Sequence, residues 1–104
     1  MNKIYLSFFV LTLLVTSSCS QETGVFALAE SEPIETSGDA ADDPALIINF
    51  KNPRSSLFFG TDKTAGVYLY DLKGVKQSFS PLGAINNIDV RQQNSEIYLA
   101  ATNR

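Results

Sequence analysis

The stretch GVYLYDLKGVKQSFSPLG, residues 66–83, decides the fold of this chain. Its residues 67–71 are apolar and aromatic, which is typical of a β-strand. Residues 73–74 form a turn dipeptide, and residues 75–79 return as a second strand. Proline and glycine within residues 81–83 then interrupt the pattern. The stretch therefore predicts an antiparallel hairpin rather than a helix.

Similar short apolar runs lie on both sides of this hairpin. The further predicted strands cover residues 46–50, 57–61, 88–91 and 97–101. Turn and loop residues separate them, and no sustained helical period is found after the first nineteen residues. Short strands with frequent glycine and proline between them predict an all-β sandwich, barrel or propeller.

Composition excludes several classes of function. The 104 residues contain 8 Lys and Arg against 11 Asp and Glu, so the net charge is -3. An acidic chain is not a nucleic-acid binder, which needs a basic surface. The absence of histidine excludes histidine-based catalysis and histidine metal ligands within this chain. One cysteine, Cys19, allows no internal disulfide.

Residues 1–19 have the layout of a secretion signal. Lys3 precedes an apolar run over residues 4–15, which is shorter than the roughly 20 residues that a spanning helix needs. The small residues before Cys19 resemble a bacterial lipobox, although Thr16 stands where that motif prefers leucine. Lipidation of Cys19 would hold the protein at a membrane surface. The alternative is ordinary cleavage near residues 18–20. Either route predicts export, to the periplasm or to the outer membrane or cell surface.

Residues 20–38 are rich in Ser, Glu, Thr and Gly, and are predicted to form a flexible tether or extended arm. Only residues 25–28 are apolar, and a strand added to a sheet edge is the alternative for them. Residues 39–104 then form the predicted β-domain.

An acidic cluster, Asp39, Asp42 and Asp43, stands before the first predicted core strand, with Pro44 behind it. Carboxylates beside exposed carbonyls are the ligands that calcium prefers. The spacing is not that of an EF-hand loop. The alternative is a solvated turn, for which aspartate and proline are common.

Two cations stand at the ends of predicted strands. Lys63 follows the strand at residues 57–61, and Arg104 follows the strand that begins at residue 97. Such a pair can clamp a phosphate group. The alternative is two ordinary surface charges.

Polar residues surround the start of the strand at residues 88–91. Asn86 and Asn87 can shape the turn by side-chain hydrogen bonds to the backbone. Asp89 and Arg91 lie on one face of the strand and can pair there. A backbone carbonyl here is a second possible calcium ligand.

Four stretches, taken in order, resemble the opening of the β-propeller phytases, or alkaline 3-phytases. Residues 39–46 look like the calcium-binding motif of that family, residues 60–74 like its first hairpin, residues 82–91 like its next signature, and residues 100–104 like the following strand end. The resemblance covers residues 32–104.

This resemblance implies a six-bladed β-propeller that hydrolyses phytate, myo-inositol hexakisphosphate, with calcium and without a covalent enzyme intermediate. At the positions that match the family, the resemblance implies that the Asp43 carboxylate is a calcium ligand. The backbone carbonyls of Pro44 and Ile88 would be further ligands, and Asp42 is a nearby candidate. By the same resemblance, Lys63 and Arg104 contact substrate phosphate. The catalytic residues are not assigned.

The chain departs from the family pattern at three places. Ile47 stands where tryptophan is usual, Gln92 replaces an aromatic residue, and the loop at residues 92–96 is short. The resemblance covers one blade and the start of the next, so we expect an N-terminal fragment that is inactive and poorly soluble by itself. The alternatives are a small non-catalytic surface lipoprotein with a β-rich binding domain, and a propeller relative that lost the chemistry.

Overall fold

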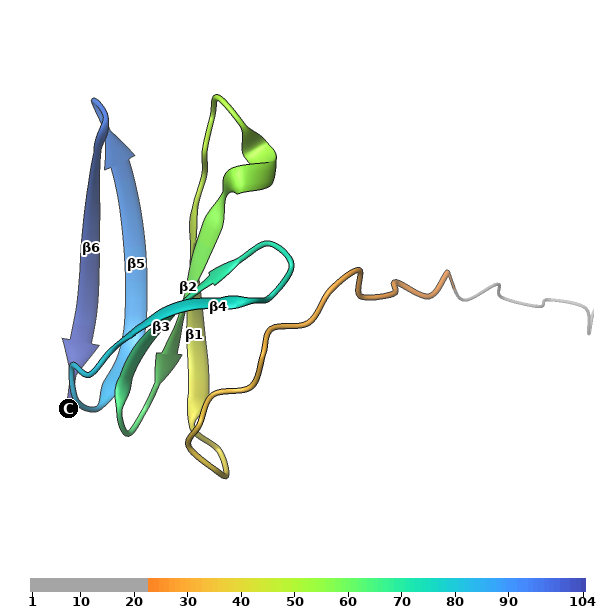
Figure 1. Cartoon of the computed structure of the whole chain (residues 1–104). Helices are drawn as coiled ribbons and strands as arrows, with labels where there is room; N and C mark the ends of the chain where they lie inside the picture. The colour runs from red at the N-terminus through yellow and green to blue at the C-terminus, as the bar shows by residue number, and fades with distance from the viewer. Residues whose placement is uncertain (1–22) are drawn as a thin grey trace, which may run out of the picture.

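The structure is a computed structural model that describes residues 23–104 (Figure 1). The predicted secretion signal and Cys19 lie outside the described residues. Within the described part, no helix is long and apolar enough to cross a membrane.

The described residues form six strands and one short 3-10 turn. The strands are β1 (Ala41–Ile47), β2 (Leu57–Asp62), β3 (Gly66–Asp71), β4 (Lys76–Ser80), β5 (Ile85–Gln93) and β6 (Glu96–Asn103), and the turn is η1 (Pro53–Ser55). Consecutive strands pair antiparallel into a four-stranded sheet of order β1-β2-β3-β4 and a separate β5-β6 hairpin. The prediction of an all-β chain is confirmed.

The first strand begins earlier than the sequence predicts. β1 starts at Ala41 rather than at residue 46, because Ala41 pairs with Asp62 and Pro44 pairs with Gly60. The acidic cluster therefore continues into a strand, and its interpretation as a solvated turn is wrong for Asp42 and Asp43. Pro44 is tolerated because β1 is an edge strand with a bulge at this point.

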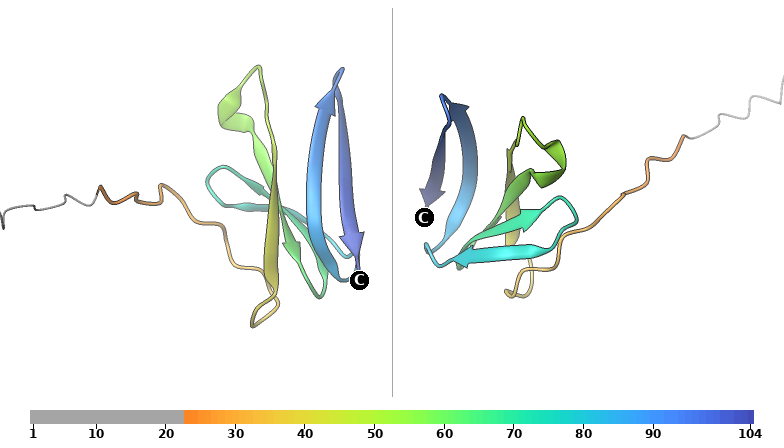
Figure 2. Two further views of the ribbon diagram at one scale, coloured as in Figure 1. Left: turned by 180° about the vertical axis from the view of Figure 1, so that it is seen from behind. Right: turned by 45° about the horizontal axis from the view of Figure 1, so that its top comes forward.

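The hydrophobic core lies where the hairpin meets the larger sheet. Val67 of β3 packs with Ile85 and Ile88 of β5, and Ala45 and Phe59 pack against them. The left view of Figure 2 shows β5 running alongside β1, and β5 also contacts β2. This packing fixes the start of β5 against the start of β1 and the end of β2.

Aromatic rings form a second cluster, on β2, β3 and β4. Tyr70 stacks on Phe58 and on Tyr68, with ring centroids 5.1 Å and 6.0 Å apart, and the Tyr68 ring lies 4.5 Å from that of Phe79. Both tyrosines are 2% exposed. The backbone N–H of Glu35, in the N-terminal arm, donates to the Tyr68 hydroxyl at 3.2 Å.

The N-terminal arm runs beside the larger sheet and is fastened to it. The N–H of Glu32 donates to the Gly74 carbonyl at 2.7 Å, and the N–H of Lys76 donates to the Glu32 carboxylate at 2.8 Å. The Thr36 hydroxyl donates to Asp62 at 2.6 Å. Residues 25–28, for which an edge strand was the alternative, lie outside every strand and are exposed.

Candidate metal and phosphate site

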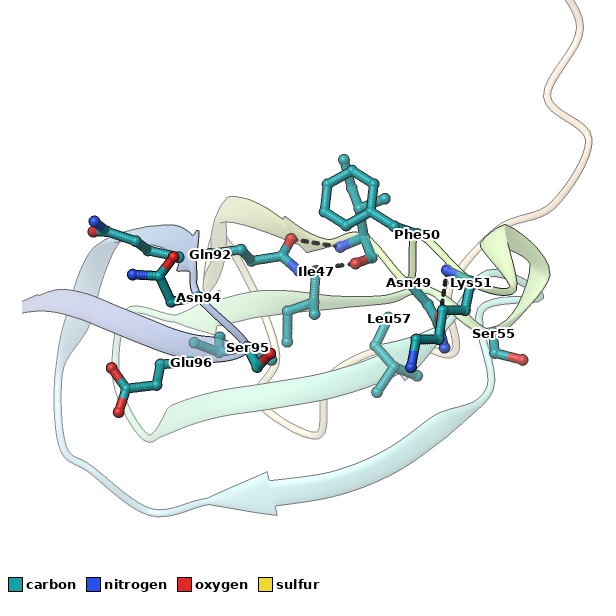
Figure 3. Close-up of a pocket in the computed structure, with 13 residues that line it drawn as sticks. Ile47, Asn49, Phe50, Lys51, Ser55, Leu57, Gln92, Asn94, Ser95 and Glu96 are labelled. Carbon is teal, nitrogen blue, oxygen red and sulfur yellow. Dashed lines mark hydrogen bonds between the residues drawn. The ribbon is translucent and has the colours of Figure 1, made fainter.

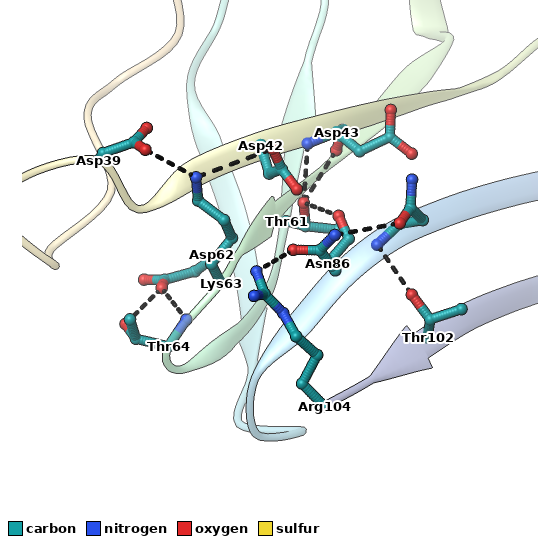
Figure 4. Close-up of polar contacts among 11 residues, drawn as sticks. Asp39, Asp42, Asp43, Thr61, Asp62, Lys63, Thr64, Asn86, Thr102 and Arg104 are labelled. Atoms are coloured by element: carbon teal, nitrogen blue, oxygen red, sulfur yellow. Dashed lines mark hydrogen bonds and ion pairs between the residues drawn. The ribbon is translucent and has the colours of Figure 1, made fainter.

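Two β-bulges bring polar residues together at one end of the strands. In β1, three steps from Ala41 to Pro44 oppose two steps in β2, and in β5 three steps from Ile85 to Ile88 oppose two steps in β6. One extra residue in a strand bends it and redirects its side chains. The bulges lie at Asp42 and Asp43 in β1 and at Asn86 and Asn87 in β5. Figure 4 shows Asp42, Asp43 and Asn86 near one another.

Thr61 of β2 connects the two bulges. Its side chain is buried, with only 1% of the residue exposed. The Thr61 hydroxyl accepts the Asp43 N–H at 2.8 Å and donates to the Asn86 carbonyl at 3.1 Å. The backbones of β1 and β5 are therefore held at a set separation by one hydroxyl group.

The Asp43 side chain reaches across to β5. Its Oδ2 accepts the N–H of Ile88 at 2.9 Å, although the two residues are 45 positions apart in the chain. The family resemblance predicts both residues as calcium ligands, and the structure places them in contact. Pro44 follows Asp43 directly in β1. Asp42 lies near Lys63 instead.

A hollow of about 450 Å³ lies at Asp43. It is lined by Asp43, Asn87, Ile88, Asp89, Ala100, Ala101 and Thr102. Its polar side chains are carboxylate, amide and hydroxyl groups, and such oxygen donors suit a hard cation such as calcium. Asp89, which the alternation of its strand predicts to pair with Arg91, also lines this hollow. Only the packing of β5 on β1 reveals which residues share the hollow.

The donor set fits calcium in kind but is small in number. The described residues hold no cluster of three or more Asp, Glu, Cys or His side chains at metal-binding distance. Calcium takes six to eight oxygens. A calcium ion here would therefore need backbone carbonyls, water and groups from elsewhere in addition to Asp43.

Lys63 is held by acidic residues. Its ammonium lies 3.1 Å from the Asp39 carboxylate and 3.9 Å from that of Asp42, and 18% of its side chain is exposed. Its backbone N–H donates to the Ala40 carbonyl at 2.8 Å. An incoming phosphate would compete with these carboxylates for the ammonium group.

Arg104 is held differently. Its guanidinium donates to the side-chain oxygen of Asn86, and its backbone N–H donates to the Ala84 carbonyl at 3.0 Å. The partner of the guanidinium is a neutral amide, so the positive charge is not cancelled. Figure 4 shows this side chain reaching from the end of β6 towards Asn86.

Asp62 at the end of β2 is a buried carboxylate that no sequence motif marks as a site residue. It is 0% exposed, and it accepts hydrogen bonds from Thr36, from the N–H and hydroxyl of Thr64, and from the N–H of Ala65. The only local signal was an aspartate at the start of a turn. Burial raises the pKa of Asp62, but the hydrogen bonds outweigh burial and hold its pKa below the ordinary value.

The expected pairing of Asp89 with Arg91 is absent between these two described side chains. Asp89 Oδ1 instead accepts the N–H of Val90 at 2.8 Å. The short local bond competes with the cross-face pairing that the alternation of β5 allows.

A second hollow, of about 590 Å³, lies at the opposite end of the strands (Figure 3). There the Gln92 side-chain amide accepts the N–H of Ile48 and donates to its carbonyl, both at 2.8 Å. Gln92, one of the departures from the family pattern, thus binds the end of β1 to the hairpin. Apolar residues and uncharged amides dominate this hollow, which also holds Lys51 and Glu96. Lys63 and Arg104 both lie at the bulge end instead.

The sequence model of the family described as Phytase matches residues 4–103 of the chain. This chain belongs to the phytase family. A 3-phytase from Bacillus subtilis (strain 168) is 39% identical over 67 residues, a match that covers 64% of this chain and 18% of that relative. The chain thus spans less than a fifth of the relative's length. The four-stranded antiparallel meander β1–β4 is the unit of which propeller blades are made, as expected for a phytase.

Proposed function

We propose that this chain supplies calcium-binding and phosphate-binding groups to a secreted, calcium-dependent phytase of the 3-phytase type. The substrate would be phytate or another phosphate monoester. Membership of the phytase family supports the hydrolase class, and the name of the B. subtilis relative suggests the 3-phytase type. The observation that carries the proposal is the contact of Asp43 with Ile88 at the same strand end as Lys63 and Arg104.

In this proposal the Asp43 carboxylate holds calcium, with the backbone carbonyls of Pro44 and Ile88 as further ligands and Asp42 as an additional carboxylate. When bound, calcium supplies charge stabilisation and activation of water for attack on phosphorus. Lys63 and Arg104 orient the phosphate group by charge-assisted hydrogen bonds.

Calcium binding by the full chain tests the proposal. We expect Asp43→Asn to weaken calcium binding by at least about tenfold, because a charged ligand oxygen becomes a neutral amide. The measurement is titration calorimetry with calcium chloride, and Glu96→Gln, at the other end of β6, is the matched control. Release of phosphate from phytate by the protein that carries this chain should stop with a chelator. Calcium binding that is the same in Asp43→Asn as in wild type would refute the assignment.

We further propose that residues 1–19 direct export and that Cys19 carries a lipid anchor. The support is the sequence pattern before Cys19. Labelled palmitate should be incorporated into the wild type and not into Cys19→Ser. Equal labelling of both would exclude the anchor.

A further inference from the structure

Asn86 occupies a place that no sequence motif assigned to the site. It lies in the bulge of β5, where one extra residue stands between Ile85 and Ile88. Its backbone and its side chain make contacts in two different directions. The backbone of Asn86 is connected to Asp43, the candidate calcium ligand, and its side chain contacts Arg104, a candidate phosphate-binding residue.

The backbone contact runs through Thr61. The Asn86 carbonyl accepts the Thr61 hydroxyl at 3.1 Å, and the same hydroxyl accepts the N–H of Asp43 at 2.8 Å. Because Thr61 is 1% exposed, water cannot readily replace either bond. The main chain at Asn86 is therefore fixed relative to Asp43.

The side-chain contact runs to Arg104. Asn86 Oδ1 accepts the guanidinium of Arg104, while the Asn86 amide N–H donates to Asn87 Oδ1 at 3.2 Å. The second bond fixes the orientation of the amide, so that its oxygen faces the arginine. A long exposed side chain such as arginine loses rotamer entropy when it is held in one place.

The two candidate phosphate-binding cations thus differ in how far neighbouring groups neutralise their charge. Lys63 lies beside two carboxylates, whereas Arg104 has an amide partner that holds it without neutralising it. We propose that Asn86 is a positioning residue that pre-orders the Arg104 guanidinium at the strand end that carries the candidate calcium ligands, with its charge free for phosphate. This inference rests on the proposed function for the identity of the anion.

The first measurement needs no ligand. In the full chain labelled with ¹⁵N, the heteronuclear NOE of the Arg104 Nε–H group reports the order of its side chain on the ps–ns timescale. We expect Asn86→Ala to lower this NOE to the value of a mobile side chain. Asn86→Asp keeps the acceptor oxygen and should restore it. Asn103→Ala is the matched control, since it removes a hydrogen bond from a side-chain amide to the Leu82 carbonyl at the same strand end.

The second measurement is titration with inorganic phosphate in the presence of calcium. Asn86→Ala should weaken phosphate binding about tenfold, since a charged hydrogen-bonded group is no longer pre-ordered. Asn86→Asp should also weaken it, because the arginine charge is then neutralised although its order is kept. In the Arg104→Ala background, Asn86→Ala should have no further effect.

An unchanged Arg104 NOE in Asn86→Ala would overturn the inference. So would an equal loss of phosphate affinity in the presence and absence of Arg104, because Asn86 would then act only through general structure. Wild-type protein that binds no phosphate would count against the proposed function and against the phosphate role of Arg104. The NOE would still decide whether Asn86 orders the arginine.

Discussion

Asp62 illustrates how a single residue can carry a charge in the interior of a small β-domain. Four hydrogen bonds reach its carboxylate, from Thr36 in the arm and from Thr64 and Ala65 in the turn after β2. A buried charge is costly unless it is hydrogen-bonded. The carboxylate therefore binds the arm to the turn that carries Lys63.

This arrangement predicts a pH dependence of stability. The pKa of Asp62 in the folded state lies below the unfolded value near 3.8. The ionised carboxylate therefore stabilises the fold at pH values above that unfolded value. The contribution is lost as the pH falls through the lower, folded value. We expect Asp62→Asn to lower the urea midpoint at neutral pH, and the difference from wild type to shrink on acidification. Urea unfolding between about pH 6 and about pH 2 measures this. A constant difference over that range would contradict the prediction.

At the scale of elements, the turn between β3 and β4 receives the N-terminal arm through a close backbone approach. Gly74 has φ +83°, and a Cβ at this position would lie 2.0 Å from the Glu30 carbonyl oxygen. Gly38 has the same φ, yet a Cβ there would meet nothing within 4 Å. Substitutions at the two glycines therefore distinguish two free-energy costs. One is the cost of a left-handed backbone for a residue with a side chain, and the other is the cost of displacing the arm.

Alanine at each position tests this difference. Gly38→Ala should cost about 1–2 kcal/mol of folding free energy, the penalty of the left-handed conformation for a residue with a side chain. Gly74→Ala should cost more, because it also pushes residues 30–31 away from the turn. Urea unfolding gives the free energies, and limited proteolysis at Glu30 and Glu32 reports release of the arm. Equal costs with an unchanged cleavage rate would show that the arm does not need the glycine.

At the scale of the whole molecule, the β5-β6 hairpin rests on the larger sheet through only one of its two strands, β5. The hairpin packs on β1 and β2 through β5, which buries Ile85 and Ile88. Every residue of β6 is exposed. Ile97, Tyr98 and Leu99 are between 43% and 53% exposed. A two-stranded hairpin is marginal by itself in water, and an apolar edge strand is a template for association.

We therefore expect the full chain to associate as its concentration rises. Leu99→Lys should reduce this association, because a charge on an edge strand opposes pairing with another chain. Leu28→Lys is the control, since it adds the same charge to an exposed position outside the strands. Sedimentation velocity over a concentration series measures the effect. Wild-type protein that stays monomeric throughout would be the contrary result.

The amino-acid sequence by itself determined the all-β class, the central hairpin and the kinds of groups expected at the site. Local alternation and turn residues were sufficient for the hairpin around Lys73 and Gly74, and short motifs pointed to the phytase family and to Asp43, Ile88, Lys63 and Arg104. These patterns can be recognised in the sequence because each is formed by residues that are close together in the chain.

Only the tertiary structure decided which of these residues meet. The early start of β1, the contact of Asp43 with Ile88, and the roles of Thr61 and Asn86 depend on contacts between distant segments. The hydrogen bond from Thr36 to Asp62 does so too. No local pattern marks a threonine that fills the gap between two bulges or an amide that orients an arginine. Strand register and the packing of one sheet on another set those distances, and they act over tens of residues rather than along a motif.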